Sequence, residues 1–279
     1  MATMRIDQIW TYPVKSMLGS RVQAASLASN GVVGDRMWAL RDEQRQAIAS
    51  ARRLAGLSRL RATLRDDGGA VITLPDGGTV ATDDGDVNER LSSAIEHPVS
   101  VWAKQPADNT EFYRRGQPDN PDFMADLRDI FGRLDDEPLP DFNVFPPEMM
   151  EFEYPPGNYF DCYPLMIMTT AALRSLRAAL PDSVIDERRF RPSLVVDSDA
   201  DGHPEFEWAG RRMRLGSAEI QFGAPCPRCV AVTREFGDDM PSDRAVLRHI
   251  VRDLDQNVGV YATVVTPGQI AVGDAVELL

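Results

Sequence analysis

Alternating apolar and polar residues dominate the first hundred positions of this 279-residue chain. Positions 4–14 carry apolar residues at a broken period of two and include Pro13, which predicts a strand that leaves into a loop. Turn signals of the Asn-Gly and Asp-Gly-Gly type separate further candidates. We expect these strands at 22–27, 32–40, 70–74, 79–82 and 98–102, and a short helix over 87–95. This part is therefore predicted to be mostly antiparallel β.

Buried strands and amphipathic helices share the second half of the chain. The apolar run 165–168 predicts a buried strand, and Thr169 and Thr170 stand at the start of a helix expected over 171–180. Another helix is expected over 241–255, and further strands at 218–222, 258–265 and 269–278. The pattern predicts an α+β fold that is mainly β. Its parts are an N-terminal β-barrel-like domain and a second β-barrel domain with peripheral helices.

The composition of the chain suggests three sections, at 1–104, 105–158 and 159–279. The middle section is rich in Pro, Asp, Glu and aromatic residues and has one amphipathic piece over 122–133. We interpret it as a connection between domains or as a lid that shapes the mouth of a pocket.

Charge and cysteine content narrow the class of protein. The 43 acidic residues outnumber the 30 basic ones, for a net charge of −13. This excess argues against non-specific binding to nucleic acids or anionic membranes, although a local basic pocket for an anionic ligand remains compatible with it. Three cysteines do not make a disulfide framework, which favours a reducing cytoplasm. The sequence shows neither a signal-peptide pattern nor an apolar run near ~20 residues, so we expect no membrane span.

Two of the cysteines lie in the motif Pro-Cys-Pro-Arg-Cys at 225–229. Prolines flank Cys226 and β-forming residues follow Cys229, so the motif is expected in a turn between strands. A dithiol redox pair would open a helix, and a structural zinc site needs four ligands, which Cys162 and the scattered histidines do not supply. The remaining interpretations are a small buried hydrophobe or a single thiolate ligand to a metal held mainly by another group.

Basic and hydroxyl residues near predicted strand ends suggest an anion site. Lys15 and Ser16 follow the first strand, and Arg36 lies within an apolar strand candidate. Thr169 and Thr170 open a helix directly after a buried strand, a typical anion-binding position. Each also has a simpler explanation. Lys15 and Ser16 fit a solvated loop, Arg36 fits a local ion pair with Asp35 or Asp42, and the two threonines fit an ordinary helix cap.

Three arginines precede the apolar strand candidate at 194–196. Arg188, Arg189 and Arg191 are either paired with local acids such as Asp186 and Glu187 or directed at a ligand. We expect one of the three to face a ligand.

Six short motifs occur in one order over nearly the whole chain. They are Tyr-Pro-Val-Lys-Ser at 12–16, Val-Gly-Asp-Arg-Met-Trp at 33–38, Asp-Cys-Tyr-Pro and a hydroxyl-bearing helix start at 161–170, Phe-Arg-Pro-Ser-Leu-Val-Val at 190–196, Cys-Pro-Arg-Cys at 226–229, and Gly-Val-Tyr-Ala to Val-Gly-Asp at 259–274. Together they resemble the MOSC family, the molybdenum-cofactor sulfurase C-terminal domain, preceded by its N-terminal β-barrel domain. Within that family they are most similar to the amidoxime-reducing components.

The resemblance implies binding of the molybdenum cofactor, a molybdopterin, and the family is also associated with binding of pyridoxal phosphate. It implies that Cys229 is the protein ligand to molybdenum and that Asp161 lies near the metal and relays protons or orients the substrate. The cofactor-binding set that it implies is Lys15, Ser16 and Arg36 at the pterin phosphate, Arg191 at the pterin, and Thr169, Thr170, Ser193 and Arg228.

The implied activity is reduction of small N-hydroxylated or N-oxide compounds. No ferredoxin-type cysteine cluster occurs in the chain, so electrons would come from a separate protein of the ferredoxin or cytochrome b5/reductase type. Pro227 replaces a family serine, and Ser193 a common asparagine. Two alternatives therefore stay open. One is a carrier of the cofactor or of a persulfide on Cys229, and the other is a MOSC-fold protein that has lost the cofactor.

Overall fold

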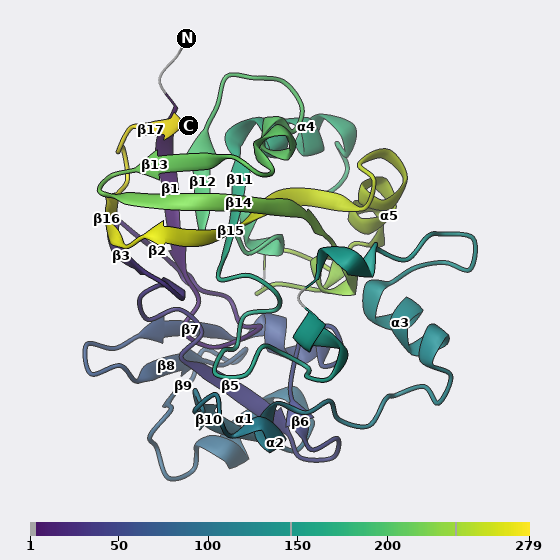
Figure 1. Cartoon of the computed structure of the whole chain (residues 1–279). Helices are drawn as coiled ribbons and strands as arrows, with labels where there is room; N and C mark the ends of the chain where they lie inside the picture. Colours follow the sequence, from purple (N-terminus) through teal and green to yellow (C-terminus); the bar gives the residue numbers. More distant parts are fainter. Residues whose placement is uncertain (1–3, 146, 238) are drawn as a thin grey trace.

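The computed structural model describes residues 4–145, 147–237 and 239–279. Strands outnumber helices in this part of the chain, so the prediction of an α+β fold that is mainly β is confirmed. Figure 1 shows the largest sheet in the upper half of the molecule and most of the smaller sheets in the lower half. No closed barrel is found among the described residues, because the sheets are open.

The largest sheet has eight strands in the order β17-β13-β14-β15-β11-β12-β1-β2. Their bounds are β1 Arg5–Thr11, β2 Ser20–Val22, β11 Leu165–Thr169, β12 Leu194–Asp197, β13 Arg212–Leu215, β14 Ala218–Pro227, β15 Asn257–Thr266 and β17 Val276–Leu278. Most neighbours are antiparallel, and β11 and β12 are parallel, with Ile167 opposite Leu194. Helix α4 (Thr170–Ala179) lies between these two strands in the chain, as a parallel pair requires.

Three smaller sheets have three strands each. Their strands are β3 Ala24–Ala28, β4 Gly31–Val32 and β16 Gly268–Ala271; β5 Trp38–Asp42, β6 Ala47–Ile48 and β10 Val99–Ala103; and β7 Arg61–Leu64, β8 Ala70–Thr73 and β9 Thr79–Ala81. The last two sheets and helix α1 (Val87–Ile95) enclose a separate apolar core that includes Leu57, Ile72 and Leu91.

The two ends of the chain meet in the sheets. β1 pairs antiparallel with β12, and β3 pairs antiparallel with β16 near the C-terminus. Ile6 and Ile9 from β1 therefore share a buried apolar cluster with Phe222 and Val260 from β14 and β15. The loop between β1 and β2, which contains Lys15, is consequently anchored to strands that come much later in the sequence.

Five α-helices occur in the described part of the chain: α1 Val87–Ile95, α2 Thr110–Tyr113, α3 Phe123–Phe131, α4 Thr170–Ala179 and α5 Arg244–Asp253. The hydroxyl of Thr169 accepts a hydrogen bond from the amide of Ala172 at 3.0 Å, and this cap starts α4. Asp243 caps α5 in the same way. None of these helices is both long and apolar enough to span a bilayer.

Short 3-10 turns complete the chain: η1 Ala55–Arg59, η2 Phe142–Val144, η3 Pro147–Met150, η4 Glu187–Arg189, η5 Pro204–Trp208 and η6 Val230–Thr233. Three expectations about local structure were wrong. Residues 269–278 do not form one strand but contribute to β16 and β17, which belong to different sheets. Residues 32–40 do not form one strand, because Gly34 and Arg36 have φ values of +87° and +48° in a turn. Residues 230–233 form η6 rather than a strand, with the amide of Val232 bonded to the carbonyl of Cys229.

A glycine in β15 permits the close approach of β11. Gly259 has a φ of +74°, and a Cβ there would lie 2.6 Å from Sδ of Met166 and 2.8 Å from the carbonyl oxygen of Ile167. Gly273 also has a positive φ, +91°, but a Cβ there would meet nothing within 4 Å. A side chain at Gly259 would therefore meet both backbone strain and steric overlap, whereas one at Gly273 would meet backbone strain alone.

We expect Gly259→Ala to lower the free energy of unfolding by about 2–4 kcal/mol, since strain and overlap add. Gly273→Ala, which has only the strain, should cost about 1 kcal/mol. Urea denaturation of both variants measures the difference. Equal losses would show that the approach of β11 is not what requires Gly259.

Candidate functional site

Lys15 connects the first half of the chain to the segment before β11. Its side chain is 4% exposed, and Nζ donates to the backbone oxygen of Tyr159 at 2.8 Å and to Oδ1 of Asp161 at 2.7 Å. Nζ also stands 3.7 Å from the centre of the Tyr154 ring, a cation–π contact. The amide of Lys15 donates to the carbonyl of Trp38, which fixes the loop to the start of β5.

The charges around Lys15 determine its protonation. Burial lowers the pKa of Lys15 to about 8; the charge of Asp161 opposes this shift, and those of Arg52 and Arg36 add to it. Burial also favours the neutral form of Asp161, but the charges of Lys15 and Arg52 outweigh it and hold the pKa of this carboxyl well below its usual range. Asp161 is therefore an ionised group at neutral pH, and its side chain is 56% exposed.

Two further cations flank a buried tyrosine. The guanidinium of Arg191 lies 4.2 Å from the centre of the Tyr12 ring, and that of Arg36 lies 5.4 Å from it. Arg36 pairs with Asp35, and Arg191 donates to the carbonyl of Met17. Burial, and then the charge of Arg36, lower the pKa of Arg191 to about 10. The charge of Arg36 thus lowers the pKa of both Lys15 and Arg191, which places the three cations in a single cluster.

The backbone of this cluster is unusual. Ser16, Arg36 and Arg191 have φ values of +67°, +48° and +55°, in the left-handed region that residues other than glycine rarely adopt. The hydroxyl of Ser16 accepts a hydrogen bond from the amide of Ala51 at 3.0 Å. Strained backbone of this kind concentrates at functional sites, where the surrounding structure holds it in place. Its occurrence at three residues of the predicted anion site supports a ligand-binding role for them.

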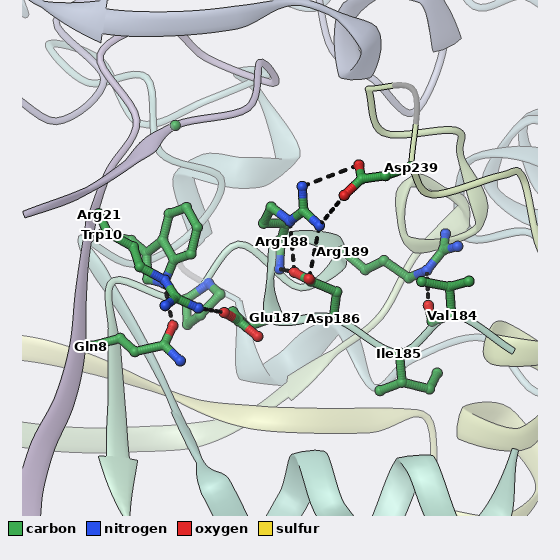
Figure 2. Close-up of polar contacts among 12 residues, drawn as sticks. Gln8, Trp10, Arg21, Val184, Ile185, Asp186, Glu187, Arg188, Arg189 and Asp239 are labelled. Atoms are coloured by element: carbon green, nitrogen blue, oxygen red, sulfur yellow. Dashed lines mark hydrogen bonds and ion pairs between the residues drawn. The ribbon is translucent and has the colours of Figure 1, made fainter. Parts of the chain in front are cut away.

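Of the three arginines before β12, only Arg191 joins the cluster. Figure 2 shows Arg188 held between Asp186 and Asp239, and Arg189 donating to the carbonyl of Val184. The side chain of Arg189 is fully buried and donates to three more carbonyls. Of the three arginines, Arg191 is therefore the one that is placed where it could face a ligand.

The cysteine motif bends away from the sheet at its end. Cys226 still belongs to β14 and is buried, which raises the pKa of its thiol. Cys229 is half-exposed and forms the N-terminal cap position of η6. The charge of a Cys229 thiolate acts on the pKa of three guanidinium groups, those of Arg52, Arg133 and Arg234. Three guanidinium groups therefore lie close enough to Cys229 to interact with it electrostatically, and a half-exposed thiol in such a place could serve as one ligand to a metal.

Arg52 joins the two halves of the site. Its Nη2 donates to the hydroxyl of Tyr154 at 2.9 Å and lies 3.4 Å from Oδ1 of Asp161. Arg234 holds this loop in position by donating to the carbonyl of Arg52 at 2.7 Å. Six charged groups therefore gather in the site with a net charge of +2, in a chain whose net charge is −13. They are Lys15, Arg36, Arg52 and Arg191 against Asp35 and Asp161.

Four residues of the predicted cofactor set have other partners. Thr169 is fully buried and donates to Glu205 at 2.7 Å, and Thr170 donates to Asp197 at 2.9 Å. Ser193 directly precedes β12, and its hydroxyl accepts a hydrogen bond from the amide of Met166 at 3.4 Å. Arg228 donates to the carbonyls of Val258 and Phe190 at 2.9 and 3.1 Å. Among the described residues, no side-chain hydrogen bond or ion pair joins these four side chains to Lys15 or Arg36.

Sequence reasoning missed Arg52, Tyr154, Arg133 and Arg234. The pair Arg52-Arg53 soon after the short apolar stretch 47–49 was a usable signal, because this chain has few basic residues. Tyr154 and Arg133 lie in the middle section, whose irregular pattern gives no indication of where they point. No three His, Cys, Asp or Glu side chains come together as a metal site in the described parts of the chain. The half-exposed thiol of Cys229 remains the group that could contribute one metal ligand.

Two curated proteins are similar to part of this chain. Mitochondrial amidoxime reducing component 2 of Macaca fascicularis is 31% identical over 135 residues, which are 42% of this chain and 38% of that protein. Mitochondrial amidoxime-reducing component 1 of Homo sapiens is 28% identical over 133 residues, 43% of this chain and 38% of that protein. The match thus spans well under half the length of these relatives.

Among solved structures, the YUAD protein from Bacillus subtilis aligns over 99% of this chain and 95% of that chain, with 11% identity and a TM-score of 0.47. YiiM from Escherichia coli aligns over 42% of this chain and 54% of that chain, with 20% identity and a TM-score of 0.33. A family model described as the MOSC N-terminal beta barrel domain matches residues 3–111, and one described as the MOSC domain matches residues 156–277. The chain therefore belongs to the MOSC family, with the N-terminal domain of that family preceding the MOSC domain.

Proposed function

We propose that this protein binds the molybdenum cofactor and reduces small N-hydroxylated or N-oxide compounds. The observation that carries the proposal is the joining of an anion-binding cluster to a half-exposed thiol through Arg52. The names of the two mitochondrial relatives supply the reaction type. Reduction of an N-hydroxylated compound consumes two electrons and two protons and releases water, so the site must hold an anionic cofactor and deliver protons.

The residues present fit such a cofactor. Arg36 uses Nη1 on Asp35, and Arg52 uses Nη2 on Tyr154 and Asp161, so the remaining donors of both have no partner among the described residues. A phosphate group would satisfy donors of this kind. Lys15, Ser16 and Arg36 would hold the phosphate end, Arg191 would contact the pterin, and Cys229 would ligate molybdenum. When bound, the cofactor supplies two-electron transfer of an oxygen atom.

Lys15 and Asp161 would divide the acid–base work. Asp161 stays ionised, and its Oδ1 is occupied by Lys15, which leaves Oδ2 to accept an N–H group of the substrate. Lys15 has a pKa of about 8, close enough to neutrality for it to give up and regain a proton. Lys15 therefore serves as the proton source and Asp161 as the group that orients the substrate.

The partners follow from the same proposal. Electrons would come from a separate protein of the ferredoxin or cytochrome b5/reductase type, and the three free cysteines fit the reducing conditions of a cytoplasm. The donors left free in the anion cluster argue against loss of the cofactor. Binding of pyridoxal phosphate is the weaker proposal, because both named relatives are amidoxime-reducing components. A persulfide carrier would use the same Cys229, and an activity assay separates it from a reductase.

Cys229→Ala should lower the molybdenum content of protein purified from molybdate-supplied cells by at least about tenfold, because the metal loses its protein ligand. Cys226→Ala should retain molybdenum, since its buried thiol lies within β14. Metal and pterin analysis checks both variants. Equal molybdenum in the two variants, or none in the wild type, would contradict the assignment.

Binding of sulfate to the cofactor-free protein should weaken as the pH rises through about 8, because Lys15 is charged below this pKa and neutral above it. The affinity should fall by roughly three- to tenfold between about pH 7 and pH 9.5. Lys15→Arg, which stays charged, should show no such fall. Calorimetric titration is suitable because the charge of sulfate is constant over this range. A parallel fall in Lys15→Arg would assign the effect to another group.

The reaction itself is tested with benzamidoxime and an artificial electron donor. Molybdenum-loaded wild type should form benzamidine, and Asp161→Asn should lower kcat by roughly a hundredfold. Asp239→Asn is the matched control, because this carboxylate pairs with Arg188 outside the site. Loaded wild-type protein that leaves benzamidoxime unreduced would refute the reductase and favour the carrier.

A further inference from the structure

Part of the middle section is tied to the loop that carries Arg52. We name residues 119–137 the clasp. Asp126 of the clasp forms a bidentate pair with Arg53, at 2.8 Å to Nη1 and 2.7 Å to Nη2. The side chain of Arg53 is 8% exposed and that of Asp126 is 7% exposed. The hydrogen bonds from Arg53 lower the pKa of Asp126, as expected for a strong buried pair. Arg53 follows Arg52 directly, so this pair fixes the backbone of a residue of the site.

The clasp is tied equally closely to the cysteine motif. Arg133, which is 6% exposed, donates through Nη2 to the carbonyl of Arg228 at 2.9 Å and to Oε1 of Gln256 at 3.0 Å. The carbonyl of Gln256 in turn accepts from the amide of Arg228 at 2.8 Å. Both polar groups of the Arg228 peptide are therefore bonded, and Cys229 is the next residue. Gln256 has a φ of +70°, which makes its position in this network a strained one.

A third contact packs the clasp against the turn that follows Cys229. Gly132 ends α3 with a φ of +62°, and a Cβ there would lie 3.1 Å from Cβ of Val230 and 2.8 Å from Leu247. Arg248 of α5 donates to the carbonyl of Gly132 and pairs with Glu137. No space remains for the clasp to shift relative to η6 without loss of these contacts.

We propose that the clasp holds the loop of Cys229 against the loop of Arg52, with Arg133 as the positioning residue. That the clasp positions a metal ligand rests on the proposed function. That it holds the two loops together does not depend on that proposal. The middle section, which the sequence suggests is a connection or lid, is thus a structural part of the site. Its two ends are Asp126 at the first loop and Arg133 at the second.

Loss of Arg133 should act locally. Without its guanidinium the carbonyl of Arg228 and Oε1 of Gln256 lose their donor, and buried acceptors without a donor are costly. Arg128 provides a matched control in the same segment. It also donates to two carbonyls, those of Leu134 and Glu137, but both belong to the clasp itself. Its loss should loosen the clasp without reaching Arg228.

The experiment is amide hydrogen exchange on cofactor-free protein. In Arg133→Met, amides in 226–233 should exchange roughly tenfold faster than in the wild type. Arg128→Met should leave this peptide unchanged and accelerate exchange in 132–139 only. In Arg133→Lys, which keeps the charge and one donor, the amides in 226–233 should exchange at a rate between those of the wild type and Arg133→Met. If Arg133→Met does not fold, Arg133→Lys takes its place.

Either of two results would overturn the clasp. One is unchanged exchange at 226–233 in the Arg133 variants, and the other is an equal acceleration of this peptide in Arg128→Met. Molybdenum content of the same variants is measured separately. A wild type that binds no molybdenum would refute the proposed function and leave the exchange result standing. Normal exchange at 226–233 would refute the clasp whatever the metal content.

Discussion

Buried positive charge that is satisfied by main-chain carbonyl groups holds this structure together. Arg189, Arg228, Arg133 and Arg234 each donate to carbonyls of segments far away in the sequence. Lys15 does the same with Tyr159. A guanidinium offers five donors in a rigid plane, so one buried side chain can fix several loops at once. In an acidic protein this use of arginine lets loops without regular secondary structure keep a defined position.

The same chemistry separates structural cations from functional ones. The guanidinium of Arg228 is bonded to two carbonyls and the Sδ of Met166, and that of Arg189 to four carbonyls, so both are committed to the fold. Arg36 and Arg52 keep donors without partners among the described residues and lie beside Asp161 or Cys229. Positive charge is costly to bury, and incompletely bonded cations beside strained backbone suit an anionic ligand.

Local patterns allowed the regular elements to be predicted, and α1 was expected over the residues that it occupies. The family motifs allowed the prediction of Lys15, Arg36, Asp161 and Arg191, which the structure brings into one cluster. The sequence could not reveal which arginines would have their donors hydrogen-bonded to backbone carbonyls, because every residue has a carbonyl acceptor. Arg133 was missed for this reason: most of its partners are backbone carbonyls, and its one side-chain partner, Gln256, lies far away in the sequence.

The pairing of β1 with β12 and of β3 with β16 has a consequence for synthesis of the chain. Lys15 lies between β1 and β3, and these strands find their partners only when residues 194–197 and 268–271 have been made. Contacts of such long sequence separation form late in folding. The anion cluster therefore forms only after residues 194–197 and 268–271 have been made, so any cofactor that occupies it enters a protein in which both strand pairs are already in place.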